Sequence, residues 1–242
     1  MTVRVLLIGG TDSSGGAGLA RDIATVAGMG AETCVAVTAV TAQTDACVSA
    51  VQMMSPELVA EQVKGASGVD AVKIGMLGSA QIVSAVAQSL PAAPLVLDPV
   101  LASTSGRALL DGAGMEALLT DLLPRTTLLT PNLPELRMLS SRLGLKDECD
   151  EATCAEALMT RGCRAVLVKG GHDEAETFCE DRLYIQTEKR QIFRGPRYGF
   201  SLRGTGCQMA SAIAVTLGQG GDLRRAVSKA RSLVMTRFRH EL

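Results

Sequence analysis

Short apolar segments rich in β-branched residues alternate with amphipathic segments of helical length along most of the chain. The first unit runs from a strand-like stretch at 3–8 through the glycine-rich segment 9–18 into a helix-like stretch at 19–29. This alternation predicts an α/β fold with a mostly parallel central sheet and helices on both faces. A polar, hairpin-like region around 182–193 precedes two final helices. Further strand-like segments lie at 33–41, 71–74, 95–97, 126–129 and 165–168, and helix-like segments at 56–67, 79–90, 134–143, 151–161 and 208–217.

Composition narrows the class of protein. The 242-residue chain is 47% hydrophobic and 20% charged, and no linker or repeat divides it, so we expect a single domain over 1–242. A formal charge of -1 with both signs mixed argues against nucleic-acid or membrane partners and favours a small molecule. No apolar run reaches membrane-spanning length, so a cytoplasmic protein is expected. Seven cysteines without a CxxC pair indicate reduced thiols rather than disulfides or a zinc site.

Polar or glycine-rich segments follow six of the predicted strands. In open α/β sheets, ligands bind at the carboxyl ends of the strands, so these segments are expected to meet at one edge of the sheet. A site assembled from several strand ends is typical of an enzyme. The six segments are 9–18, 41–45, 75–76, 98–99, 130–135 and 169–172.

A tight turn at Gly204, Thr205 and Gly206 opens a predicted helix near the end of the chain. The glycines let successive backbone N–H groups face an anion, and the start of the helix adds partial positive charge. Cys207 lies in the first turn of this helix, where its thiol pKa is expected to be depressed. It would then accept a proton from a substrate hydroxyl or bind that hydroxyl. The alternative is a small buried cysteine without a chemical role.

Three other strand ends carry residues suited to metal and phosphate binding. Asp98 is placed to hold Mg²⁺ or to orient a hydroxyl, and otherwise to cap a helix. Asn132 and Glu135 are three apart at a helix start, where they can share a divalent cation or cap the helix. Lys169 begins a glycine turn that can approach a nucleotide phosphate, or can simply be a tight turn.

The glycine-rich segment 9–18 matches neither a GxGxxG fingerprint nor a Walker sequence. Asp12 with its neighbouring hydroxyls favours recognition of a polar substrate there, although such loops are often simple turns. Together, these segments supply hydrogen-bond donors for an anion, ligands for a divalent metal, and a candidate base for the acceptor group. These are the parts that phosphoryl transfer needs. A kinase without a Walker lysine is therefore predicted.

In order and spacing, these segments resemble the ribokinase-like superfamily, and within it the branch that phosphorylates hydroxymethylpyrimidine and its monophosphate in thiamine synthesis. The superfamily generally carries Asp after Gly-Thr-Gly, whereas the pyrimidine branch resembles this chain in having Cys207. The motifs that carry the resemblance are Gly10-Thr11-Asp12-Ser13-Ser14-Gly15-Gly16-Ala17-Gly18, Thr38-Ala39-Val40-Thr41-Ala42-Gln43, Lys73-Ile74-Gly75-Met76-Leu77, Leu97-Asp98-Pro99-Val100, Thr130-Pro131-Asn132-Leu133-Pro134-Glu135, Lys169-Gly170-Gly171-His172 and Gly204-Thr205-Gly206-Cys207.

The resemblance implies that ATP and Mg²⁺ are the cofactors. By it, Gln43 would hydrogen-bond the aminopyrimidine ring, and residues 101–106 would form a flap that excludes water. Substrate contacts would come from Gly10, Asp12, Asp22, Thr41, Gln43 and Met76, nucleotide contacts from Asn132, Lys169, Gly170 and Gly171, metal contacts from Asp98 and Glu135, and charge neutralisation and base catalysis from Gly204, Thr205, Gly206 and Cys207. From its own charge, Arg203 is a further candidate substrate contact.

Two positions depart from the family pattern. Arg203 stands where the family usually has histidine, and Gln208 where it commonly has threonine. An arginine can bind a phosphate already present on the substrate, so we expect a preference for the monophosphate. A pyridoxal or pyridoxine kinase, and a non-catalytic pyrimidine-binding regulatory protein on the same fold, are the alternatives. A homodimer is expected from the resemblance.

Overall fold

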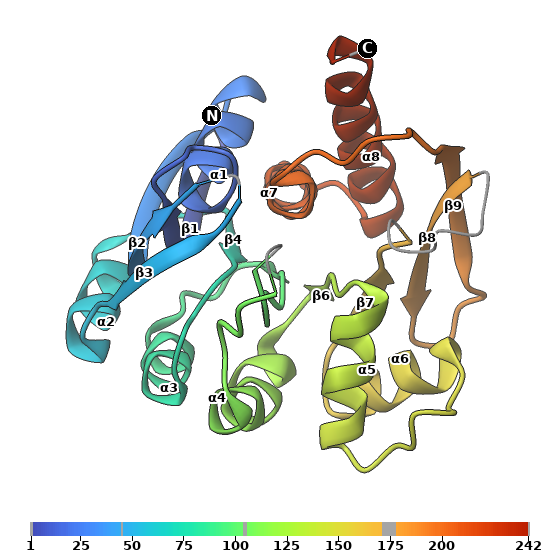
Figure 1. Ribbon diagram of the computed structural model, residues 1–242, viewed down its shortest axis with the longest axis horizontal. Coiled ribbons are helices and arrows are strands. Elements are labelled where there is room, and N and C mark those ends of the chain that lie inside the picture. Colours follow the sequence, from blue (N-terminus) through green and yellow to red (C-terminus); the bar gives the residue numbers. More distant parts are fainter. Residues whose placement is uncertain (1, 45, 104–105, 171–177, 242) are drawn as a thin grey trace.

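The computed structural model describes residues 2–44, 46–103, 106–170 and 178–241 (Figure 1). In this part of the chain nine strands form one sheet, in the order β3-β2-β1-β4-β5-β6-β7-β8-β9. Neighbouring strands from β2 to β7 are parallel, and the pairings at the two ends of the sheet are antiparallel. The parallel strands are β1 (Arg4–Asp12), β2 (Glu32–Gln43), β4 (Ala71–Ile74), β5 (Leu95–Leu97), β6 (Leu128–Leu129) and β7 (Ala165–Val168).

The antiparallel additions lie at opposite edges of the sheet. The predicted hairpin is confirmed as β8 (Phe178–Ile185) and β9 (Gln191–Pro196). At the other edge, β3 (Val48–Met53) pairs with β2 and was not predicted from the sequence. Most of its residues are exposed or only half-buried, so its sequence lacks the apolar pattern that marks the central strands.

Helices cover both faces of the sheet, as predicted (Figure 1). One face carries α1 (Gly18–Gly28), α7 (Thr205–Gly218) and α8 (Leu223–His240). The other carries α2 (Pro56–Gly65), α3 (Ala80–Ser89), α4 (Gly112–Ala117), α5 (Leu133–Arg142) and α6 (Glu151–Thr160). A π-helical turn (Leu118–Leu122) and a 3₁₀ turn (Leu123–Arg125) continue α4, and neither was predicted.

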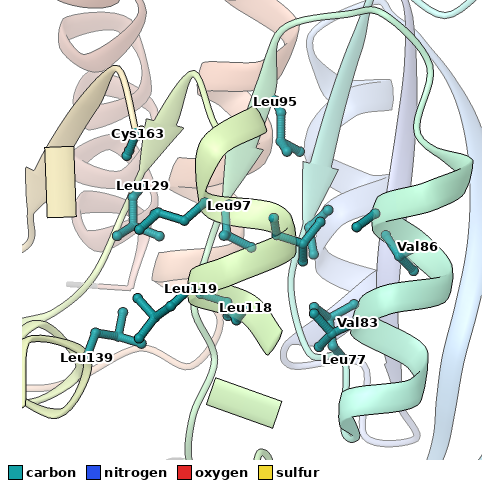
Figure 2. Close-up of a cluster of buried hydrophobic side chains, with 14 of the residues drawn as sticks. Leu77, Val83, Val86, Leu95, Leu97, Leu118, Leu119, Leu129, Leu139 and Cys163 are labelled. Carbon is teal, nitrogen blue, oxygen red and sulfur yellow. The ribbon is translucent and has the colours of Figure 1, made fainter. Parts of the chain in front are cut away.

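Each face of the sheet has its own apolar core. Along β1 the side chains alternate between them: Leu6 and Ile8 join the core on the α2–α6 side, while Val5 and Leu7 join the core under α1, α7 and α8. Figure 2 shows the first core, in which side chains of α3, β5, the π-helical turn and α5 meet. With few aromatic residues in the chain, this packing is almost wholly aliphatic.

The strand order fixes where a ligand can enter. The chain passes from β1 to β2 on one side and then returns to place β4 on the other side of β1. Such a reversal of strand order leaves a crevice at the carboxyl ends of the two strands, which is where α/β proteins bind ligands. Gly10 and Met76 face each other at this point: a Cβ on Gly10 would lie 2.9 Å from the Met76 sulfur.

Among the described residues, no helix combines the length and the apolar character needed to cross a membrane. All seven cysteines are free in the structure.

Candidate active site

The turn at Gly204 packs against the glycine-rich loop after β1. Gly204 has a φ of +73°, and a Cβ there would lie only 2.3 Å from the carbonyl oxygen of Gly16. Any other residue would meet both an unfavourable backbone conformation and a backbone clash. The helix α7 begins at the next residue, Thr205, so the N–H groups of its first turn lack partners within the helix. The two glycine-rich segments therefore form one structural unit.

Gly206 brings that first turn against two charged side chains. The position of a Cβ on Gly206 lies 3.3 Å from Nζ of Lys169 and 3.7 Å from Oδ2 of Asp98. The N-terminal end of α7, a lysine and a carboxylate thus meet at one point of the sheet edge. This combination suits a phosphoryl group that carries both negative charge and a metal ion.

Arg203 ties the same turn to the end of β1. Its Nη2 donates to Oδ2 of Asp12 at 2.9 Å, and its Nη1 donates to Oγ of Ser14 at 2.9 Å and to the carbonyl of Thr44 at 3.3 Å. The Asp12 carboxylate also accepts from the backbone N–H groups of Ser14 and Ala17. Asp12 and Arg203, both predicted as substrate contacts, therefore form an ion pair that organises the loop between them.

Cys207 lies partly buried in the first turn of α7, where the backbone N–H of Gly18 donates to it. The predicted depression of its pKa is wrong for this structure. Burial, with help from the carboxylates of Asp22 and Asp98, outweighs the ammonium of Lys73 and raises the pKa of the thiol to about 11. The position at the helix start predicts a lower pKa from the local backbone alone, without the burial of the side chain and the distant carboxylates. With a pKa of about 11, the thiol of Cys207 is neutral near pH 7.

Lys73, Asp22 and Ser211 form a buried polar network that was not predicted from the sequence. Nζ of Lys73 lies 2.7 Å from Oδ2 of Asp22, and both side chains are 1% exposed. The hydroxyl of Ser211 donates to Oδ1 of the same carboxylate at 2.8 Å. Asp22 was predicted to line the substrate pocket, but both of its oxygens are bound within the protein. The available signal was a lysine inside the otherwise apolar strand β4.

Asp98 and Lys169 form a second ion pair, directly at the end of α7. Nζ of Lys169 donates to Oδ1 of Asp98 at 2.8 Å, and Thr130 donates to the same oxygen at 3.1 Å. Burial opposes ionisation of Asp98, but Lys169 and Lys73 outweigh it and lower the pKa of that carboxyl. For Lys169, burial is outweighed by Asp98 and Glu135, which raise its pKa. Both groups are therefore charged, and Oδ2 of Asp98 faces Gly206.

Asn132 and Glu135 form a reciprocal cap at the start of α5. Oδ1 of Asn132 accepts from the Glu135 N–H at 2.8 Å, and Oε2 of Glu135 accepts from the Asn132 N–H at 2.9 Å. The capping role that the sequence allowed is confirmed. Burial raises the pKa of Glu135 to about 7, with Lys169 opposing this shift and Asp98 adding to it. Near pH 7 the carboxyl of Glu135 is therefore only partly ionised.

The donor set fits a magnesium ion that arrives on a nucleotide. Mg²⁺ in such sites takes one or two protein carboxylates together with phosphate oxygens and water. Oδ2 of Asp98 faces the turn at Gly206, and burial raises the pKa of Glu135 to about 7. Within the described ranges, no three His, Cys, Asp or Glu side chains converge as they would in an all-protein metal cage. Asp98 and Glu135 are the residues that would hold the ion.

The turn after β7 requires a glycine at position 170. A Cβ on Gly170 would lie 1.9 Å from the carbonyl oxygen of Glu180, so strand β8 leaves no room for a side chain. The Gly170 N–H donates to Oδ1 of Asp181 at 2.9 Å, and Asp181 forms a buried ion pair with Arg231 of α8. Neither Asp181 nor Arg231 was singled out from the sequence. Gly171 and His172 lie outside the described residues.

The remaining predicted substrate residues lie around the crevice beside β1. Thr41 donates to the carbonyl of Thr11 at 2.8 Å, and Oε1 of Gln43 lies 3.4 Å from the same hydroxyl. The backbone of Gln43 is held by Ser13, whose hydroxyl accepts its N–H at 2.8 Å. Met76 is nearly fully buried, and its carbonyl accepts from Thr38. The structure thus brings Gly10, Thr41, Gln43 and Met76 to the ends of β1, β2 and β4.

A mostly parallel α/β sheet whose strand ends bring together a glycine turn at a helix start, a lysine–aspartate pair and an adjacent cysteine is the arrangement expected of a small-molecule phosphotransferase. The sequence profile of the family named phosphomethylpyrimidine kinase matches residues 12–242. The chain belongs to this family, as its motifs predicted.

Two curated relatives named hydroxymethylpyrimidine/phosphomethylpyrimidine kinase match this chain over most of their own length. The hydroxymethylpyrimidine/phosphomethylpyrimidine kinase of Rhizobium meliloti (strain 1021) is 38% identical over 240 residues, which cover 96% of this chain and 89% of the relative. The protein of that name from Streptomyces coelicolor is 39% identical over 236 residues, covering 95% and 86% respectively. The prediction of a kinase is confirmed by these relatives.

Solved structures with the same fold come from enzymes with two related activities. The crystal structure of phosphomethylpyrimidine kinase from Clostridium difficile 630 superposes with a TM-score of 0.82 at 30% identity, covering 98% of this chain and all of that one. Pyridoxal kinase from Staphylococcus aureus, solved in complex with AMP-PCP and pyridoxal, gives a TM-score of 0.85 at 29% identity, with 97% and 87% covered. The predicted ribokinase-like fold class is confirmed by both likenesses.

Proposed function

We propose that this protein transfers the γ-phosphoryl group of ATP to 4-amino-5-hydroxymethyl-2-methylpyrimidine and to its monophosphate, which yields the diphosphate used in thiamine synthesis. The observation that carries the proposal is the meeting of Gly206, Lys169 and Asp98 at the start of α7, next to Cys207. Phosphoryl transfer needs little covalent chemistry from the protein beyond positioning and charge neutralisation, and this arrangement supplies both.

In the proposed reaction, Cys207 lies beside the acceptor oxygen, which is the hydroxyl of the free alcohol or a phosphate oxygen of the monophosphate. With the alcohol, the O–H bond breaks and the proton moves to Sγ of Cys207, which must first be ionised. With the monophosphate, the attacking phosphate oxygen is already anionic and needs no base. The substrate oxygen forms a bond to the γ-phosphorus while the bond from that phosphorus to the ADP oxygen breaks. ADP leaves with that electron pair. The N–H groups of Gly204, Thr205 and Gly206 neutralise charge on the transferring group, as preorganised donors do in other transferases.

The nucleotide would approach from the Lys169 side of the site. Lys169 and Gly170 would contact its phosphates, with Asn132 and Gly171 assigned to the nucleotide as well by family resemblance. Mg²⁺, held by Asp98 and Glu135, would supply Lewis-acid neutralisation of phosphate charge. The Lys169–Asp98 ion pair supports this placement, because it presents one cation and one carboxylate oxygen at the same turn.

The substrate would occupy the crevice beside β1. The amide of Gln43 offers both a donor and an acceptor to the edge of an aminopyrimidine, and Met76 supplies an adaptable apolar wall. We further propose a preference for the monophosphate. The supporting observation is the guanidinium of Arg203, which is fixed beside Asp12, Ser14 and the glycine-rich loop, within reach of the crevice rim.

A pyridoxal or pyridoxine kinase is the second candidate. The likeness to the Staphylococcus aureus enzyme at 29% identity favours it, while Cys207 and Gln43 match the pyrimidine branch. A pyrimidine-binding protein without turnover is the third reading, motivated by the changes at Arg203 and Gln208. Retention of Asp98, Glu135, Lys169 and Cys207 argues against it.

We also propose a homodimer in the cytoplasm. Ile192 and Phe178, on the antiparallel strands at one edge of the sheet, are each about half exposed, which suits an interface. Seven free thiols suit a reducing compartment. Light scattering coupled to size exclusion would test the dimer, and a monomeric mass would exclude it.

Release of ADP from Mg·ATP tests the proposed function. The pyrimidine alcohol, its monophosphate and pyridoxal are compared in parallel, for the wild type and for Cys207→Ala. The proposal predicts turnover of the pyrimidine compounds, faster for the monophosphate, and its loss in the variant. Turnover of pyridoxal alone would establish the second candidate. Tight binding of the pyrimidine without ADP release would establish the third.

A further inference from the structure

The turn at Gly204, Thr205 and Gly206 is held by the last helix of the chain. Nη1 of Arg237 donates to the carbonyl oxygen of Arg203, the residue directly before this turn, at 2.8 Å. Arg237 lies in the last turn of α8, 34 residues further along the chain. The transfer steps proposed above do not use this hydrogen bond.

The peptide between Arg203 and Gly204 carries the contact into the turn. This peptide is trans, and a trans peptide is planar and rigid, so its C=O and N–H groups point in opposite directions. A donor that holds the carbonyl on one side therefore directs the N–H of Gly204 to the other side, away from Arg237. Among the described residues, that N–H has no hydrogen-bond partner. The proposed function assigns it to the transferring phosphoryl group.

An aromatic cluster fixes the end of α8 beside the segment that leads into the turn. The ring of Tyr198 stacks on the ring of Phe238, with 4.9 Å between the centroids and 4° between the planes. The ring of Phe200 lies 5.6 Å from that of Phe238. The chain has only two tyrosines, four phenylalanines and no tryptophan, so this cluster holds a large share of its aromatic side chains. These contacts anchor Arg237, the neighbour of Phe238, against the segment before the turn.

The charge of Arg237 has no carboxylate at ion-pair distance in the part of the chain that the structure describes. Burial and the charge of Arg21 on α1 lower the pKa of Arg237, and Glu241 opposes them. Arg21 also flanks the turn, since its Cγ lies 3.1 Å from the Cβ position of Gly204. Two arginines near one another repel, and both remain charged. Their positive potential favours an anion at the turn that they contact.

We propose that Arg237 is a positioning residue for phosphoryl transfer: its hydrogen bond to the carbonyl of Arg203 directs the N–H of Gly204 toward the transferring group. The inference rests on the proposed function, which places that group at the turn. Arg237 acts through the backbone and touches neither substrate nor nucleotide. Removal of one preorganised donor lowers kcat about 100-fold or more, so misdirection of a donor that is still present should lower it about tenfold.

Nuclear magnetic resonance of the peptide between Arg203 and Gly204 tests this link without any pyrimidine. Protein labelled with ¹³C-carbonyl arginine and ¹⁵N-glycine gives correlated signals only from Arg–Gly pairs, which the sequence has at 161–162, 194–195 and 203–204. Inorganic phosphate is the probe. In the wild type, the 203–204 signal is expected to shift as phosphate is added, while the other two signals serve as internal references.

Arg237→Met removes the donor and keeps an apolar stem of similar length. It should move the 203–204 carbonyl signal before phosphate is added, and raise the Kd for phosphate, read from the same signal, about tenfold. Arg239→Met is the matched control, because Arg239 is exposed in the same helical turn and carries the same charge. It should leave both readings unchanged. Arg237→Lys keeps the charge, covers the case in which the methionine variant does not fold, and should raise Kd by a smaller factor.

Turnover assays separate positioning from a purely structural role. Arg237→Met should lower kcat about tenfold, with KM for the pyrimidine and thermal stability little changed. Guanidinium added at low concentration should restore part of kcat in Arg237→Ala and have no effect on Arg239→Ala. A side chain needed only for folding would show neither the selective loss of kcat nor the rescue.

Equal Kd values for phosphate in the wild type and in the folded Arg237 variants would overturn the proposal. An equal rise of Kd in Arg239→Met would also overturn it, because the effect would then come from net charge alone. A wild-type 203–204 signal that does not respond to phosphate would overturn it as well, since the turn would bind no anion. A raised Kd in Arg237→Met, in a protein that lacks turnover, would contradict the proposed function while upholding the link between Arg237 and Gly204.

Discussion

Arg203 and Asp12 form an ion pair with 2.9 Å between Nη2 and Oδ2, which joins the turn before α7 to the end of β1. Both side chains are largely buried, so the pair is screened less than a surface salt bridge. It lies at the rim of the crevice that the proposed function assigns to the substrate. Arg203 is also one of the two positions at which the chain departs from the pattern of the family it resembles.

Arg203→Ala is expected to raise KM for the pyrimidine monophosphate about tenfold or more, and to raise KM for the free alcohol less. Loss of the guanidinium frees the glycine-rich loop and removes a candidate phosphate ligand. Steady-state kinetics on both substrates measure this, with Arg203→Lys as the variant that keeps the charge but not the two-pronged geometry. Comparable turnover of alcohol and monophosphate by wild type and Arg203→Ala would refute the preference for the monophosphate.

Gly204→Ala should abolish most activity because the added Cβ would lie 2.3 Å from the carbonyl of Gly16 and distort the anion-binding turn. Loss of one preorganised donor typically lowers kcat about 100-fold or more. Gly220 is a matched control, since it has a similar φ of +79° but no atom within 4 Å of its Cβ position. Gly220→Ala should cost about 1 kcal/mol of stability and leave kcat intact. Equal losses of kcat in Gly204→Ala and Gly220→Ala would show that the turn at Gly204 has no specific role in catalysis.

Glu135→Gln should change how stability depends on pH. The folded-state pKa of Glu135 is raised from 4.5 to about 7, mainly by burial, so the folded protein binds the proton more tightly than the unfolded chain. Glu135 therefore stabilises the folded protein fully below about pH 4.5, and this stabilisation is lost as pH rises through about 7. The free energy of unfolding changes by about 3 kcal/mol at most. Gln stays neutral and can still accept the Asn132 N–H.

Urea unfolding of wild type and Glu135→Gln at several pH values measures this difference. The stability of the variant relative to wild type should increase between about pH 4.5 and about pH 7.5. A constant difference across that range would show that Glu135 titrates normally. Activity of the variant should fall at every pH, because a proposed metal ligand is lost.

Gly170→Ala should destabilise the protein by about 3 kcal/mol or more, since the new Cβ would overlap the backbone of Glu180 in β8. Gly28→Ala, at the end of α1, meets no atom within 4 Å and should be neutral or stabilising by up to about 1 kcal/mol. Thermal unfolding compares the two. An unchanged melting temperature in Gly170→Ala would mean that β8 can move away from the turn.

The central fold followed from the sequence because its parallel strands are short, apolar and regularly separated by helices. The strand ends carrying Gly10, Asp98 and Lys169 were predicted for the same reason: topology brings the ends of parallel strands together. Strand β3 was missed because its exposed residues carry no burial pattern. The capping box of Asn132 and Glu135 was one of two stated alternatives, and local spacing was sufficient to propose it.

The electrostatics of the site did not follow from the sequence. The pKa of Cys207 was expected to be low from its helix position, but Asp22 and Asp98, which come from distant segments, act together with burial to raise it. Lys73 appeared only as part of a motif, because its partner Asp22 lies 51 residues away. Such relations depend on tertiary packing, and no local pattern contains them.

The most direct measurement of the central claim is ³¹P NMR of the reaction of Mg·ATP with hydroxymethylpyrimidine phosphate. The account predicts that resonances of a pyrimidine diphosphate and of ADP grow in equal amounts with wild type, and that both are absent with Cys207→Ala of unchanged thermal stability. Free inorganic phosphate as the product, or the same diphosphate formed at the wild-type rate by Cys207→Ala, would contradict it.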